Sequence, residues 1–344
     1  DPVRQQYPWK YLAITEQKQF SLPLWNPYSF SGTPLLATMQ GGIFYPLNLL
    51  FFLFAFPIAW SLFIIIQPLL AGTFLYLYLR NLHLTRLSSL FGSVTYAFCG
   101  FAIAWLEWGT VGHVIIWLPL ALLSIDRIFS SYAYSNALEF DEESKRIKNR
   151  RIIFWFLLYV CSCLAAFFAG HLQTFFYLFL FVWCYFFARW IQFGKTHKLL
   201  SLFILVNLLF MALTIVQWLP TIRFIGESAR AIDLNWYKDG WFIPWQHLIQ
   251  FISPDFFGNP ATLNYWGVWN YGELVGYVSI TPLIFVLLAL FYRHDKKTLF
   301  FGTMFFLSLL FALPTIFAKI PFLLEIPFLA TAQPTRLLFI TDFC

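Results

Sequence analysis

Long apolar stretches recur along this chain and restrict what it can fold into. A helix needs about 20 apolar residues to cross the hydrocarbon core of a bilayer. Eight stretches approach or reach that length, at residues 58–80, 87–107, 112–130, 152–169, 172–190, 199–219, 275–292 and 298–317. Charged residues make up only 11% of the chain, against about 25% in ordinary soluble domains. The mean hydropathy is +0.69. The sequence therefore predicts an all-α polytopic membrane protein.

Basic residues gather in the short connections on one side of these predicted spans. If residues 1–57 lie outside the membrane, the inner connections hold 14 of the 22 Lys and Arg residues. These are Arg80, Arg86, Arg127, Lys145, Arg146, Lys148, Arg150, Arg151, Arg189, Lys195, Lys198, Arg293, Lys296 and Lys297. Cytoplasmic loops are enriched in Lys and Arg. The net charge of +6 thus indicates topology, and no nucleic-acid partner is expected.

The predicted spans divide the chain into five segments. They are a first extracytoplasmic loop with an interfacial helix at 44–56 (1–57), six spans (58–219), a second extracytoplasmic loop (220–274), two further spans (275–317), and an outer loop with the start of another helix (318–344). Within the second loop, a short helix is expected at Pro244–Ile252. Since the chain opens inside a loop and stops in an apolar run, we expect a fragment that lacks a preceding helix and later ones.

Two carboxylates are candidates for catalysis. Asp1 precedes Gln5 and Gln6 in the first loop, where it could be a general base on an acceptor hydroxyl or a ligand of a divalent cation. The alternative is a solvated loop acid or helix cap. Glu107 lies beside Trp105 at the outer end of the second span, and a carboxylate at membrane depth is costly enough to suggest function. In the headgroup zone that cost would vanish.

Two histidines also fall at outer helix ends. His113 and His171 could bind a metal together with Glu107 if their helices converge. No local ligand spacing supports this, and a single hydrogen-bonded histidine at each helix end is the alternative.

Three arginines are candidates for phosphate binding, to which a guanidinium is well suited. Arg223 and Arg230 share a predicted helical face with Glu227, and Arg336 follows later in the chain. Anchoring to lipid headgroups or an internal ion pair are the alternatives. Glu273 closes the second loop against the seventh predicted span, and its role is interpreted as mainly structural.

Several motifs resemble those of a known family. D-x-x-x-Q-x-Y-P-W, PLWNPYSFSGTPLLA and FYPLNLL in the first loop are similar to the YfhO-like family of bacterial integral-membrane proteins. The segments VTYAFCGF, GHVIIWLPLALLSIDR, AGHLQTFFY, LPTIRFIGESAR and FISPDFFGN follow in the same order. This family belongs to the GT-C superfamily of polytopic glycosyltransferases.

The resemblance implies a GT-C-like helical bundle with two large extracytoplasmic loops in a bacterial cytoplasmic (plasma) membrane. It implies transfer of a sugar from a polyprenyl-phosphate donor to a cell-envelope polymer or lipid, with the catalytic acid in the first outer loop, by position Asp1. Many GT-C enzymes carry a second acid there, where this chain has Gln5 and Gln6. Whether the site binds a divalent cation, Mg²⁺ or Mn²⁺, therefore stays open. The resulting candidates are catalytic Asp1 and Glu107, and substrate-binding Gln5, Gln6, His113, His171, Gln173, Arg223, Arg230, Glu273 and Arg336.

Two other functions fit the same composition. A transporter or flippase for a lipid-linked sugar would carry polar residues and broken helices at mid-membrane depth. The predicted spans have almost no charge at their centres, which favours chemistry at the interface. A non-catalytic envelope-assembly protein is the third hypothesis.

Overall fold

The protein is a bundle of long helices. The computed structural model describes residues 2–136, 142–228, 241–268, 270–326 and 329–344. Within these ranges the chain forms helices and turns, and the only strand-like pairing is an isolated bridge between Asn26 and Thr33. This confirms an all-helical polytopic membrane protein.

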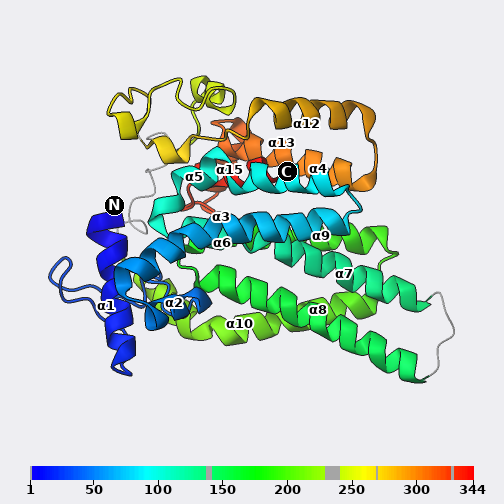
Figure 1. The fold of residues 1–344 in the computed structure, drawn as a ribbon, viewed down its shortest axis with the longest axis horizontal. Coiled ribbons are helices and arrows are strands. Elements are labelled where there is room, and N and C mark those ends of the chain that lie inside the picture. Colours follow the sequence, from blue (N-terminus) through cyan, green and yellow to red (C-terminus); the bar gives the residue numbers. More distant parts are fainter. Residues whose placement is uncertain (1, 137–141, 229–240, 269, 327–328) are drawn as a thin grey trace.

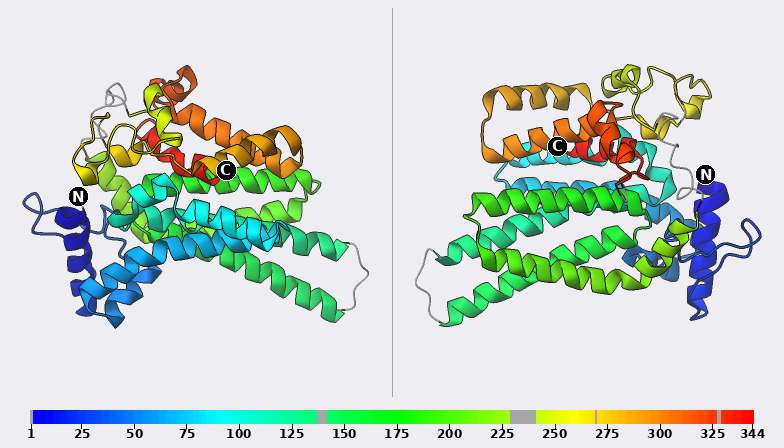
Figure 2. Two further views of the ribbon diagram at one scale, coloured as in Figure 1. Left: turned by 45° about the horizontal axis from the view of Figure 1, so that its top comes forward. Right: turned by 180° about the vertical axis from the view of Figure 1, so that it is seen from behind.

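Six helical segments are long and apolar enough to cross a membrane in the described part of the chain. They are α3 (Phe56–Asn81), α4 (Arg86–Ala97) with α5 (Gly100–Ala104), α6 (Val111–Ile115) with α7 (Leu118–Asn136), α8 (Glu142–Phe168), α9 (Leu172–Gln192) and α10 (His197–Gly226). They run side by side and overlap the first six predicted spans (Figures 1 and 2).

The two ends of this bundle differ. At one end, called here the turn end, short turns at residues 82–85, 193–196 and 293–295 join consecutive helices. At the opposite end, called the loop end, lie α1 (Tyr7–Lys18) and the second loop (Figure 1). α1 runs across the ends of the long helices, which is the orientation of a helix lying in a membrane interface.

The first loop folds differently from the sequence prediction. Instead of an interfacial helix over 44–56, residues Pro46–Asn48 (η2) and Leu49–Leu53 (α2) form two short helices. The longest helix of the loop is α1, which buries Lys10, Ala13 and Ile14. Its sequence mixes apolar and polar residues without a strong period, so the apolar pattern did not reveal it.

The last two predicted spans are also shorter or bent. α12 (Ile280–Tyr292) has 13 residues, about 20 Å of helix against the roughly 30 Å of a bilayer core. Residues 275–279 before it are not helical: Ser279 has φ +76°, outside the helical range, and the Tyr277 carbonyl accepts a hydrogen bond from the Gly100 N–H at the start of α5 (2.6 Å).

The other predicted span is α13 (Lys296–Ala312) followed by α14 (Ile316–Leu323), which meet at 65°. The break falls at Leu313 because the following residue is Pro314, and a residue before proline avoids the α conformation. The chain ends in η8 (Pro334–Leu337) and α15 (Leu338–Phe343).

Burial varies strongly among the long helices. The apolar window of α6–α7 is 78% buried, whereas those of α3 and α10 are 28% buried. α6–α7 is thus the central span. Leu205, Leu208 and Leu219 of α10 are each more than 60% exposed. Such a continuous apolar surface is what a membrane-embedded helix presents to lipid.

A buried ion cluster holds four helices together near the turn end. Asp126 of α7 is 1% exposed and forms ion pairs with Arg189 of α9 (2.8 Å) and Lys297 of α13 (3.0 Å). Tyr185 donates a hydrogen bond to Asp126 (2.8 Å) and accepts one from Tyr78 of α3 (2.8 Å). Arg189 and Lys297 therefore point into the bundle. The sequence had placed both of them in the connections on the inner side of the membrane.

Removal of the Asp126 carboxylate should destabilise the fold. In Asp126→Asn, two cations lose their counter-charge in a largely buried place, so we expect a loss on the order of 3 kcal/mol in the free energy of unfolding. Denaturant unfolding in detergent micelles measures this. Glu227→Gln is the control, because Glu227 and Arg223 form an exposed pair and its loss should change little. Equal effects of the two variants would contradict the role assigned to the cluster.

Candidate functional site

The start of the chain is fixed by a hydrogen-bonded group of glutamines. Gln5 and Gln6 both donate to the side-chain oxygen of Gln40, at 2.6 Å and 2.8 Å. Gln6 is 6% exposed. The two predicted substrate-binding glutamines thus lie together in η1 (Pro2–Gln6), with their amide groups already bonded to the first loop.

Behind this group lies a buried lysine. Lys10 of α1 is 3% exposed, and its Nζ donates to Asn48 Oδ1 (3.0 Å) and lies 5.1 Å from the Phe63 ring centroid. No ion pair of Lys10 with a carboxylate is present in the described part of the chain. Burial lowers the pKa of Lys10 from 10.5 to about 7.

His113 lies against the same phenylalanine, with its ring centroid 3.8 Å from that of Phe63. Its Nδ1 lies 2.9 Å from the hydroxyl of Tyr45, which accepts a hydrogen bond from Trp117 Nε1 (3.2 Å). His113 is fully buried. It therefore bonds within the bundle and does not join His171 and Glu107. Among the described residues no three His, Cys, Asp or Glu side chains are grouped as metal ligands, so the hypothesis of a His113–His171–Glu107 metal site is wrong.

The other predicted histidine lies in a second, larger group. Arg336 of η8 forms an ion pair with Glu273 of η7 (Tyr271–Glu273), with Arg336 NH2 and Glu273 Oε1 2.5 Å apart. Its NH1 lies 2.5 Å from His171 Nε2, and its guanidinium carbon lies 4.3 Å from the Trp105 ring centroid. Glu273 is 1% exposed and accepts a further hydrogen bond from Thr335 (2.8 Å). Arg336 is thus an internal ion-pair partner, one of the alternatives left open by the sequence.

Gln173 lies at the edge of the same group. Its Nε2 donates to the carbonyl of Gln333 (2.6 Å), which also accepts a longer hydrogen bond from Tyr177 (3.5 Å). His171, Gln173, Glu273 and Arg336 are therefore neighbours, although they come from three distant parts of the sequence. We call this set, with Trp105 and Thr335, the arginine cluster.

The first loop packs directly behind the arginine cluster. Gly170 precedes His171 and has φ +101°, and a Cβ there would lie 3.0 Å from the carbonyl oxygen of Met39. Only glycine combines this left-handed conformation with so close an approach. The segment that contains Gln40 is thereby held against the start of α9.

Glu107 is exposed, in η3 (Leu106–Trp108). This turn follows Trp105, whose ring covers Arg336 and whose Nε1 donates to the Gly272 carbonyl (2.9 Å). η1 packs against the same turn. Glu107 therefore lies at the loop end, on a segment shared by the arginine cluster and the start of the chain.

The structure does not place the remaining candidates in the arginine cluster or in the glutamine group. Arg223 and Glu227 form an exposed pair 3.5 Å apart at the end of α10. Asp1 and Arg230 lie outside the described residues.

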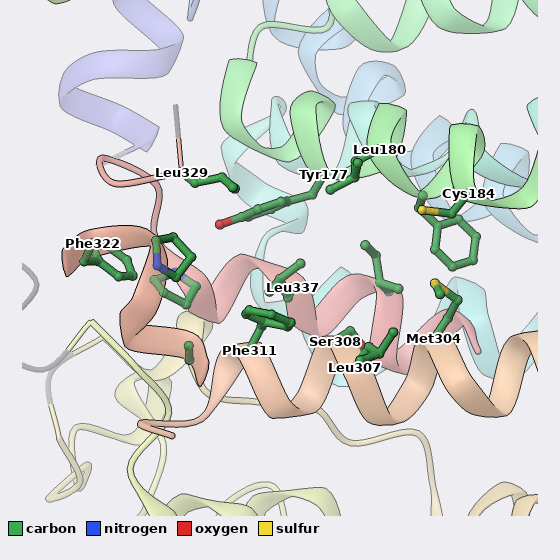
Figure 3. Close-up of a pocket in the computed structure, with 15 residues that line it drawn as sticks. Tyr177, Leu180, Cys184, Met304, Leu307, Ser308, Phe311, Phe322, Leu329 and Leu337 are labelled. Carbon is green, nitrogen blue, oxygen red and sulfur yellow. The ribbon is translucent and has the colours of Figure 1, made fainter. Parts of the chain in front are cut away.

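An apolar cavity adjoins the arginine cluster. Its volume is about 250 Å³, and Figure 3 shows Tyr177, Leu180 and Cys184 of α9 facing Met304, Leu307 and Phe311 of α13 across it. Pro334 and Leu337 of η8 also line it, and they lie two positions before and one position after Arg336. One short helix thus contributes both to an apolar cavity and to a cationic group.

Several residues of the arginine cluster and of the group around Lys10 were not singled out from the sequence. Lys10 and Asn48 have no motif spacing, and their pairing depends on α1, which was not predicted. Thr335 and Gln333 flank Arg336 in the segment AQPTRLLF, which was the one available signal.

Comparison with known proteins identifies one family. Residues 39–135 match the family model described as bacterial membrane protein YfhO. The matched segment runs from Met39 through α7 and includes Glu107 and His113. It confirms the resemblance over these residues. No curated protein and no solved structure matches the chain.

The pKa of Lys10 predicts a pH-dependent stability. Between pH 7 and 10.5 the unfolded chain holds a proton that the folded chain lacks, so the free energy of unfolding should rise with pH in this window, by up to about 1.4 kcal/mol per unit. Below pH 7 Lys10 is protonated in both states, so the free energy of unfolding stays at its low value and no longer depends on this group. Lys10→Met should remove the rise, whereas Lys18→Met, which changes an exposed lysine of the same helix, should keep it. An unchanged slope in Lys10→Met would contradict the assignment.

Loss of the Glu273 carboxylate should release the second loop. Glu273→Gln leaves Arg336, which is 8% exposed, without its counter-charge. We expect faster protease cleavage in the second loop and a lower melting temperature. Asp255→Asn is the matched control, because Asp255 bonds Tyr271 and Asn259 in exposed positions of the same loop. Cleavage at the native rate in Glu273→Gln would show that the ion pair does not anchor the loop.

Proposed function

We propose that this protein is a membrane glycosyltransferase of the GT-C type. It would move a sugar from a polyprenyl-phosphate donor to a cell-envelope polymer or lipid, with the loop end on the extracytoplasmic side. The observation that carries the proposal is the apolar cavity beside the arginine cluster at that end. A donor of this class has the same two parts, a long apolar chain and a charged phosphate.

The cavity and the cluster share η8. Pro334 and Leu337 line the cavity, while Arg336 between them points to Glu273 and His171. Arg336 itself does not line the cavity, so the proposal places the phosphate end of a bound chain beside η8, facing the arginine cluster. Small-molecule pockets typically measure about 300–1,000 Å³. A cavity of about 250 Å³ suits one part of an isoprenoid chain, with the rest in lipid.

The reaction would be a direct displacement at the anomeric carbon. A carboxylate takes the proton of the acceptor hydroxyl, the new glycosidic bond forms, and the bond from the anomeric carbon to the phosphate oxygen breaks. Polyprenyl phosphate leaves with the bonding electrons. Glu107 is an exposed acid on the segment that covers Arg336 with Trp105, which makes it a candidate base besides Asp1.

Arg336 would act by electrostatics. Its charge is held in place before any ligand binds, by the Trp105 ring and by Glu273, whose carboxylate also accepts a hydrogen bond from Thr335. Little reorganisation is therefore needed when charge develops on the leaving phosphate. The described residues form no group of metal ligands, and the proposed steps use none.

A transporter of lipid-linked sugars is the second candidate. The observation in its favour is the Asp126 cluster, since ionisable residues within membrane spans often mark a substrate or ion path. The Asp126 cluster lies near the turn end and is internally paired, whereas the cavity and arginine cluster lie toward the loop end.

Sugar transfer in membranes that contain the full-length protein tests the proposal. With a radiolabelled polyprenyl-phosphate sugar as donor, loss of the catalytic base in Asp1→Asn or Glu107→Gln should slow transfer about 100-fold or more. Glu16→Gln removes another acid of the first loop, in the last turn of α1, and should retain the native rate.

The outcomes separate the hypotheses. Native rates in both base variants would remove these two carboxylates from the mechanism. Absence of transfer by the native protein with every donor, together with movement of labelled lipid across the bilayer of proteoliposomes, would replace the enzyme by the transporter.

A further inference from the structure

A second cavity lies at the turn end, far along the bundle from the arginine cluster. It has a volume of about 200 Å³ and lies between α12, α13 and the turn that joins α3 to α4. Leu82 and Leu84 of the turn, Val286 and Leu290 of α12, and Phe301 and Phe305 of α13 form most of its wall. The interior is thus mainly apolar.

Cations surround this cavity. Arg293 and Lys297 line it, with side chains 58% and 31% exposed. The guanidinium of Arg80 donates a hydrogen bond to the carbonyl of Leu84, another lining residue. Arg80 itself is exposed. Three positive charges therefore lie at or beside the wall.

The single acid of the lining is already engaged. Asp295 is the N-cap of α13, and its carboxylate accepts hydrogen bonds from the backbone N–H groups of Lys297 (3.0 Å) and Thr298 (3.1 Å). It also pairs with Arg293 Nε (2.5 Å). Lys297 is also engaged, because its Nζ pairs with Asp126 (3.0 Å). The guanidinium of Arg80 has no carboxylate partner among the described residues, so its charge leaves the rim of the cavity positive.

The place of the cavity in the fold exposes it to lipid. The outer side of α12 is apolar and exposed at Ile284, Leu287 and Leu288. The charged residues follow at the end of the helix, where the chain turns into α13. Apolar walls below a positively charged rim match an acyl chain joined to an anionic headgroup.

We propose that this cavity binds one acyl chain of an anionic glycerophospholipid, with the headgroup phosphate on the exposed Arg293 and Arg80. The volume fits part of a single chain and is smaller than the pockets that enclose a whole small molecule. The proposal does not depend on the glycosyltransferase function. It makes the turn end a lipid-binding site of the protein.

Lipid binding to the full-length protein tests the proposal. The protein in detergent would be titrated with phosphatidylglycerol or phosphatidylcholine and the adducts counted by native mass spectrometry. Native protein should prefer phosphatidylglycerol, and Arg293→Gln should reduce this preference about fivefold, the contribution expected of one cation near an anionic lipid.

Two further variants separate the cavity from general surface charge. Lys296→Gln removes an exposed cation that does not line the cavity, and should reduce the preference less than Arg293→Gln does. Ala289→Trp fills the cavity without a change of charge, and should reduce the binding of both lipids. Melting temperatures show that each variant is folded.

Three results would overturn the proposal. Equal binding of the two lipids by the native protein would exclude a site for anionic headgroups. Equal effects of Lys296→Gln and Arg293→Gln would indicate a diffuse charge effect. Native lipid binding by folded Ala289→Trp would show that no chain enters the cavity.

Discussion

The loop end of the bundle depends on the ion pair between Glu273 and Arg336. A buried charge is tolerated only when it is paired and hydrogen-bonded. Here the two charges are paired with each other and contact Thr335, His171 and Trp105, so that the group joins four separate segments: η7, η8, the start of α9 and the turn before η3. The pair therefore fixes the second loop, the start of α9 and η8 in one arrangement. The exposed Glu107 and the apolar cavity take their positions relative to this group.

The bundle has two charged clusters with different chemistry around them. The arginine cluster adjoins an apolar cavity and the exposed turn that carries Glu107, while Arg336 and Glu273 themselves are buried. The Asp126 cluster is enclosed by α3, α7, α9 and α13, and its tyrosines complete the hydrogen bonding of the acid. Burial with full pairing favours a structural role for the second cluster, whereas the neighbourhood of the first is suited to binding an amphiphile.

The sequence predicted the helical class and the first six spans because bilayer thickness sets the length of an apolar stretch. It also placed His171, Gln173, Glu273 and Arg336 among the candidate site residues, but it did not predict that they contact one another. Their meeting depends on how α9, η7 and η8 pack, which local patterns do not encode. α1 and the buried Lys10 were missed for the same reason, since neither has a period or motif. α12 begins only after Ser279, which has a positive φ, and the segment before it bonds to Gly100, a residue far away in the chain.

The bend between α13 and α14 affects when the second loop can find its partners during synthesis. At the end of α13 the carbonyl of Ala312 is free to accept a hydrogen bond from the N–H of Ile243 in the second loop (2.9 Å). Ile243 leaves the ribosome long before Ala312, and Glu273 before Arg336. Since chains fold from the N-terminus during synthesis, the six long helices can pack first while the second loop waits for its partners. The contacts of the second loop with α13 and η8 therefore form only after these segments have been made, and until then the loop is open to a chaperone or a quality-control protease.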